Sequence, residues 1–176
     1  MPKPTRSTIF HEAGHAVAAA VLGIETETVS VEPLEDAVGY HMLTGTEIDR
    51  LEAAREVSSG MLPKEGVAVP SFHDAQAVLR AHLTMVLAGE VAQRRAVPTS
   101  YRHHHVELGD HRQAVELILC LASGPDELMT LGPAVGEGAA RLLDEHWQAV
   151  EAVAEALRDK RTLTGVQVRQ IVATAT

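Results

Sequence analysis

The chain has 176 residues, with 15 Lys and Arg against 24 Asp and Glu, which gives a net charge of -9. This length predicts a single stand-alone domain over residues 1–176. The acidic balance argues against nucleic acid and anionic membranes as partners, and the one cysteine, Cys120, excludes a disulfide scaffold. The sequence has neither a long apolar run nor a hydrophobic signal segment, so we expect a cytoplasmic protein.

The first half of the chain alternates between helical and β-like patterns. Its predicted elements are a helix over 7–22, a strand over 26–32, a strand over 39–43, a helix over 47–57 and a loop over 58–70. Ser7 or Thr8 is expected to cap the first helix, and Gly23 stands where a left-handed C-terminal glycine is expected. The two strands are expected to pair as a small hairpin at the edge of a sheet.

The second half has an almost entirely helical pattern. It predicts a long helix over 73–95, an irregular stretch over 99–108, a helix over 109–122 and more helix in the last third. Thr164 and Gln167 have the spacing of a capping box for a short terminal helix. We therefore expect a mainly α fold with a small β hairpin or sheet.

The sharpest pattern is the H-E-x-x-H segment His11-Glu12-Ala13-Gly14-His15, in a chain with ten histidines. Positions i and i+4 of a helix lie on one face, so the imidazoles of His11 and His15 can reach one Zn²⁺ ion. Glu12 would lie beside the vacant coordination position, where it can take a proton from metal-bound water and pass it to a leaving amine. The alternative is a helix whose histidines are simply partly buried.

A catalytic zinc usually has three protein ligands, so a third ligand must come from elsewhere in the chain. The candidates that the residues themselves leave open are Asp110, His111, Glu90, Glu107 and the run His103, His104 and His105. Three adjacent side chains cannot all face one metal, so we interpret the histidine run as a solvated loop. Glu90 could also hydrogen-bond a ligating histidine or form a surface salt bridge. His82, on the apolar side of its helix, is interpreted as a core histidine with a hydrogen-bond partner.

Several segments, taken in chain order, resemble the peptidase domain of FtsH-type AAA+ zinc proteases. They are residues 11–17, Val29-x-Val31-x-Pro33 with Gly39-Tyr40, Leu87-Ala88-Gly89-x-x-Ala92, Gly109-Asp110-x-x-x-Ala114, and the closing segments 143–157 and 162–165. The resemblance covers nearly the whole chain and implies a mainly helical zinc-peptidase fold, Zn²⁺ as the cofactor and Asp110 as the third ligand. A carboxylate oxygen is an acceptable zinc ligand.

The chain departs from that family in several places. It has no P-loop pattern ending in Lys-Ser/Thr and no membrane segment, so we expect no unfolding of substrates by ATP hydrolysis. Gly109 replaces the family's Asn before the aspartate, and a histidine-rich stretch replaces the segment that precedes it. Glu90 replaces the family's Arg, and Gln93-Arg94 replaces its acidic pair.

These features predict an ATP-independent zinc metalloendopeptidase, a hydrolase that cleaves peptides or unfolded chains. The metal ligands are then His11, His15 and Asp110, and Glu12 is the general base and acid. The alternative hypothesis is a metal-binding interaction or regulatory module that is derived from the same fold and has little turnover.

The substrate would bind at Gly39 and Tyr40, where the predicted edge strand could add an extended peptide through main-chain hydrogen bonds. The expected partners are thus peptides or unfolded proteins, without nucleic acid or membrane. Assembly into a homo-oligomer, or work beside a separate unfoldase, stays open at this point.

Overall fold

The computed structural model describes residues 3–34, 38–98 and 108–175. In these residues the chain forms seven helices and a three-stranded antiparallel sheet, which confirms the prediction of a mainly helical fold with a small sheet. The helices are α1 (Arg6–Leu22), α2 (Gly45–Ser58), α3 (Phe72–Ala96), α4 (Leu108–Leu121), α5 (Pro125–Glu145), α6 (Trp147–Lys160) and α7 (Gly165–Thr174). The strands are β1 (Thr26–Ser30), β2 (Tyr40–Leu43) and β3 (Thr162–Thr164).

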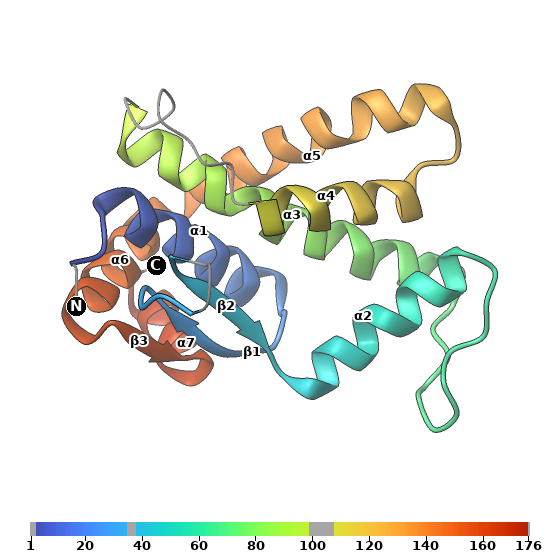
Figure 1. Cartoon of the computed structure of the whole chain (residues 1–176), viewed down its shortest axis with the longest axis horizontal. Coiled ribbons are helices and arrows are strands. Elements are labelled where there is room, and N and C mark those ends of the chain that lie inside the picture. The colour runs from blue at the N-terminus through green and yellow to red at the C-terminus, as the bar shows by residue number, and fades with distance from the viewer. Residues whose placement is uncertain (1–2, 35–37, 99–107, 176) are drawn as a thin grey trace.

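Helix α1 is in contact with α3, α6, α7 and β1 (Figure 1). The prediction that Ser7 or Thr8 caps it was wrong, because the helix begins earlier and the side chain of Thr5 accepts the capping hydrogen bond from the backbone of Thr8. Gly23 ends the helix as predicted, with a left-handed φ of 71° and its N–H bonded to the carbonyl of Ala19. That conformation favours glycine over other residues.

Small residues let α1 and α3 approach closely. A Cβ atom added to Gly14 would lie only 2.5 Å from the carbonyl oxygen of Ala88 and 2.7 Å from the Cβ of Ala92. The alanines that follow in α1 are also fully buried: Ala16, Ala18 and Ala19. Helix α1 therefore gains its stability from tertiary packing, and the residues that it turns toward α3 are held in fixed places.

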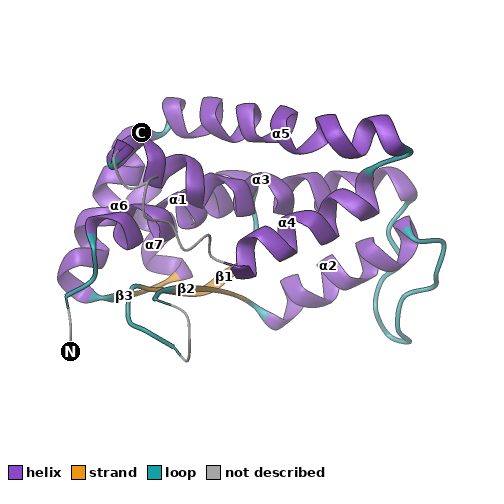
Figure 2. Cartoon of the chain, turned by 45° about the horizontal axis from the view of Figure 1, so that its top comes forward, coloured by secondary structure: helices purple, strands orange, loops and turns teal. Residues whose placement is uncertain are grey.

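The sheet has the strand order β2-β1-β3, with both pairs antiparallel. The expectation of a hairpin alone at a sheet edge was therefore incomplete: β1 is the central strand, because the short β3 pairs with its other side. In the register, Val29 faces His41 on one side and Leu163 on the other. The helices lie on one face of the sheet (Figure 2). Strand β2 is an edge strand, as predicted for the segment around Tyr40.

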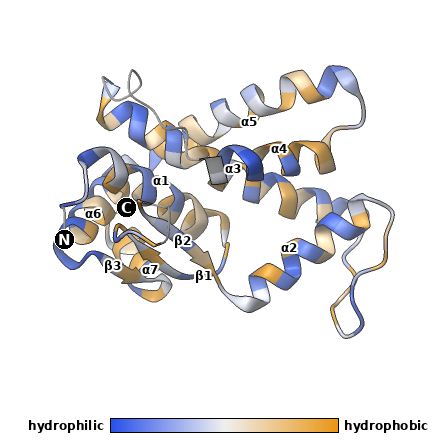
Figure 3. Cartoon of the chain, viewed as in Figure 1, coloured by the Kyte–Doolittle hydropathy of each residue, from blue (hydrophilic) through white to orange (hydrophobic). Residues whose placement is uncertain are grey.

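In the C-terminal third, helices α5 and α6 precede strand β3, which returns the chain to the sheet. The apolar repeat around His146 spans α5 and α6, which are separated at that residue by a non-helical φ of -114° and ψ of 23°. The capping box of α7 is present as predicted, with Thr164 and Gln167 bonded reciprocally. Hydrophilic and hydrophobic residues alternate along α5, as expected for a helix with one buried face (Figure 3). Within the described residues, no helix combines the length and the apolarity needed to cross a bilayer.

Candidate metal centre

Three side chains, from two helices that are far apart in the sequence, meet at one point beside α3. The Nε2 atoms of His11 and His15, one turn apart on α1, lie 3.0 Å from each other. The Oδ2 atom of Asp110, in the first turn of α4, lies 2.8 Å from Nε2 of His11 and 3.0 Å from Nε2 of His15. Both histidines are buried, and the Asp110 side chain is 31% exposed, so the cluster reaches solvent on the aspartate side. The structure thus brings together the three residues that the resemblance implied.

Helix α3 fixes the orientation of both imidazoles. Nδ1 of His15 lies 2.9 Å from the backbone carbonyl of Met85, which can only accept, so this nitrogen carries a proton. Nδ1 of His11 lies 3.0 Å from Oε1 of Gln93 and donates to it in the same way. Each ring therefore turns Nε2, the nitrogen that can bind a metal, toward Asp110. Sequence reasoning did not identify Met85 or Gln93 as partners of these histidines.

The convergence of these atoms favours a bound proton or a metal ion. With both Nδ1 atoms protonated, two imidazole lone pairs and a carboxylate oxygen would face one another at hydrogen-bond distance. Burial alone would lower the pKa of His15, but the charge and hydrogen bond of Asp110 outweigh it, so the pKa of His15 is raised. Burial would raise the pKa of Asp110, but the two histidines outweigh it and hold that pKa well below its ordinary range. A proton or a metal ion is therefore strongly favoured at this point.

The donor set and its spacing fit a zinc ion. The three donor atoms lie within 4.8 Å of one another. A tetrahedral ion with bonds of about 2.0–2.1 Å separates its ligand atoms by about 3.3 Å, and the separations of 2.8–3.0 Å between these atoms are close to that value. Gly89 on α3 gives the rings their space, because a Cβ there would overlap the imidazole of His15 and lie 3.0 Å from Nε2 of His11.

Glu12 lies next to this cluster in the interior. The residue is 2% exposed, and the backbone of Gly39, just before β2, packs directly on its carboxylate. A Cβ on Gly39 would lie 2.6 Å from Oε1 of Glu12, so a larger residue there would force the Glu12 side chain to move. Gly39 was predicted as a substrate-binding residue, and the structure places it against Glu12. Tyr40 follows as the first residue of β2.

His41 on β2 is a neighbour of the cluster that the sequence reasoning missed. Its ring lies nearly parallel to that of His15, with 6.2 Å between the ring centres, and its Nε2 is 2.8 Å from Oγ1 of Thr26. Burial and the positive charge of His15 lower the pKa of His41 to about 3. His41 is therefore a neutral ring that packs beside the cluster at neutral pH.

The other candidate ligands do not join the cluster. Glu90 is exposed and forms an ion pair with Arg94 one turn along α3, at 3.0 Å, which agrees with the surface salt bridge and not with a contact to a histidine. His111 is exposed on α4. Glu107 and the run at 103–105 lie outside the described residues.

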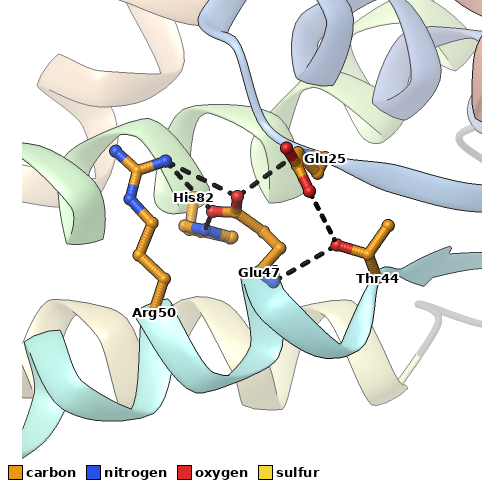
Figure 4. Close-up of polar contacts among 5 residues, drawn as sticks. All are labelled: Glu25, Thr44, Glu47, Arg50 and His82. Atoms are coloured by element: carbon orange, nitrogen blue, oxygen red, sulfur yellow. Dashed lines mark hydrogen bonds and ion pairs between the residues drawn. The ribbon is translucent and has the colours of Figure 1, made fainter. Parts of the chain in front are cut away.

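His82 belongs to a second buried polar group (Figure 4). It is fully buried, as predicted for a core histidine, and its Nε2 lies 2.9 Å from Oε1 of Glu47, which is itself only 3% exposed. Burial lowers the pKa of His82 despite the hydrogen bond and charge of Glu47, so the neutral ring donates to the carboxylate. The backbone N–H of Glu25 also donates to Glu47. This group ties α2 to α3 and to the start of β1.

No protein-family model and no curated protein matches this chain.

Proposed function

We propose that the chain is a zinc metallopeptidase of the FtsH type, which hydrolyses peptides or unfolded chains without using ATP. The observation that carries the proposal is the convergence of two correctly oriented imidazoles and one carboxylate beside a buried glutamate. Two imidazoles and one carboxylate are a donor set typical of catalytic zinc, because they leave a fourth position open. The order of motifs along the chain supports the same family.

Each side chain of the site would have its own chemical role. His11, His15 and Asp110 would hold the ion through Nε2, Nε2 and Oδ2, while Gln93 and the Met85 carbonyl keep the imidazoles in the ligating tautomer. Bound zinc supplies a Lewis acid and lowers the pKa of a coordinated water toward about 7. Glu12 would accept the proton of the attacking water and deliver it to the amine that leaves.

The edge strand β2 is the surface on which a substrate would lie. Its outer side is unpaired in the described sheet, so an extended peptide can add to it through main-chain hydrogen bonds. Apolar side chains in or just before this strand are exposed and could contact side chains of the peptide: Val38 and Met42. Because the strand begins directly after Gly39, a peptide on it would pass close to Glu12.

One observation favours the second candidate function, a metal-binding regulatory module. Glu12 is 2% exposed and its carboxylate lies against Gly39, so a substrate reaches it only if the surrounding residues move. A module that binds zinc without turnover would need no such movement. The two functions differ in one respect that can be measured, which is cleavage by the zinc-loaded chain.

The test compares the wild-type chain with Glu12→Gln on an intrinsically unfolded substrate such as β-casein, each loaded with one equivalent of zinc. We expect the variant to retain zinc and to lose cleavage by about 10²–10⁴-fold, the range for removal of a general base. Glu90→Gln is the matched control, because Glu90 is 52% exposed and paired with Arg94 on the surface. Cleavage at the wild-type rate by Glu12→Gln would reject Glu12 as the base. A zinc-loaded wild type without any cleavage would favour the regulatory module.

A further inference from the structure

A cavity rich in basic side chains lies on the side of α1 that faces α6. It has a volume of about 770 Å³. Its charged lining consists of Lys3, Arg6, Arg158, Arg161, Glu151 and Glu155. We call this cavity the basic pocket. It is separate from the histidine cluster, which lies on the α3 side of α1.

The lining of the basic pocket is net positive, with four basic side chains against two carboxylates. Arg158 forms ion pairs with Glu155 and Asp159. Lys3, Arg6 and Arg161, in contrast, have no carboxylate partner among the residues that the structure describes, and Arg6 only stacks over the ring of Phe10, 5.3 Å from its centre.

This clustering is unexpected for the composition of the chain. The whole protein has a net charge of -9, so each basic side chain has many carboxylates with which it could pair. Three cations that form no ion pair with a described residue nevertheless line one concave space, beside the positive end of the α1 dipole. Like charges held together repel each other, and a bound anion would remove that repulsion.

We propose that the basic pocket binds a small phosphorylated molecule through its phosphate oxygens. A phosphate monoester carries about -1.5 to -2 charges at neutral pH, and arginine forks bind its oxygens in pairs. The volume is in the range of pockets for small ligands, about 300–1,000 Å³. The acidic surface elsewhere opposes large polyanions, so nucleic acid and anionic membrane are disfavoured as the source of the phosphate.

Arg161 allows binding to be separated from folding. It has a positive φ of 67°, the one such value for a non-glycine residue in the described part of the chain. Glycine adopts that conformation without strain. Arg161→Gly therefore removes a cation from the pocket while the melting temperature stays equal to that of the wild type or rises.

The experiment is a calorimetric titration of the full chain, dialysed free of metal, with sodium pyrophosphate at 0.15 M salt. Inorganic phosphate and succinate are titrated in parallel. We expect one pyrophosphate site per chain, weaker phosphate binding and the weakest binding for succinate. Arg6→Gln and Arg161→Gly should each weaken pyrophosphate binding by about tenfold or more, as expected for loss of one charge-assisted contact. The control Arg141→Gln changes an exposed residue of α5 outside the lining of the pocket, makes the same charge change and should alter affinity less than twofold.

Several outcomes would overturn the proposal. One is the absence of saturable pyrophosphate binding, and another is equal weakening by the pocket variants and Arg141→Gln, which would indicate only a general charge effect. Unchanged pyrophosphate affinity in Arg6→Gln would remove the pocket as the site. Tighter binding of succinate than of phosphate would show that the pocket prefers a carboxylate to a phosphate.

Discussion

Replacing Gly89 by alanine separates helix stability from metal binding, because the two should respond in different ways. Gly89 lies inside α3, opposite the two histidines of α1. A Cβ at this position would overlap Cε1 and Nε2 of His15 and lie 3.0 Å from Nε2 of His11. The added methyl group therefore points at the atoms that we propose as zinc ligands.

The magnitudes follow from these contacts. Alanine is better than glycine in a helix interior by about 0.8–1.0 kcal/mol. Displacing the ring of His15, which is buried and hydrogen-bonded to the Met85 carbonyl, costs about 1–3 kcal/mol. The helix term offsets part of this cost, so the metal-free variant should lose at most about 2 kcal/mol of stability and still fold. A displaced ligand weakens metal binding more than the loss of an outer hydrogen bond, which costs about 10–100-fold, so we expect a loss of at least about 100-fold in zinc affinity.

Zinc affinity would be measured by competition with a chromophoric chelator, and stability by urea unfolding followed by circular dichroism. Gly138→Ala is the matched control, because Gly138 lies inside α5 and a Cβ there would meet no atom within 4 Å. The control should gain about 0.8–1.0 kcal/mol of stability and keep its zinc affinity. Wild-type zinc affinity in Gly89→Ala would refute the assignment of these histidines as ligands.

Three further predictions concern the same cluster. Asp110→Ala should lower zinc affinity by orders of magnitude, measured by the same competition. Changing the histidines at 103–105 to alanine should leave the tight site intact. The opposite result would assign the third ligand to the histidine run. Gln93→Leu should weaken zinc binding by about 10–100-fold through loss of the hydrogen bond to His11, with little change in the urea midpoint of unfolding. An affinity equal to that of the wild type would show that this hydrogen bond does not orient the ligand. Because the pKa of His15 is raised, protons should compete with zinc at a higher pH than for a free imidazole. Affinity measured from pH 8 to 5 should be level above that pKa and fall about tenfold per pH unit below it for each proton displaced, and a level profile throughout would contradict this.

The part of the site on α1 could be predicted from the sequence because helical periodicity determines which residues share a face. His11 and His15 share a face at i, i+4 spacing, and the run of small residues around them indicates a helix that other helices approach closely. The third ligand could not be chosen from the residues alone. Asp110 and His111 are neighbours in the sequence, yet about 100° of helix rotation places one in the cluster and the other in solvent.

The fold was predictable where elements are long. Strand β3 has only three residues, 162–164, and it was missed because a strand of that length has no periodicity of its own. Its pairing with β1 depends on contacts between segments more than 130 residues apart, such as the hydrogen bond between Ser30 and Thr162. Glu47 was expected only as the first residue of a helix over 47–57, since nothing local in the sequence shows that it is buried against His82.

The contacts that α3 makes with the cluster do have a sequence signal, although it can be read only once the ligands are known. Met85, Gly89 and Gln93 follow one another at intervals of four, so they form a single stripe, and each meets a histidine of α1. Glu90 is one position away from that stripe, which turns its side chain to the surface and to Arg94. Along this stripe, Met85 offers a backbone acceptor, Gly89 leaves space for the rings and Gln93 offers a side-chain acceptor. No helix propensity or charge pattern links these three features. They serve one site only because α3 packs closely against α1.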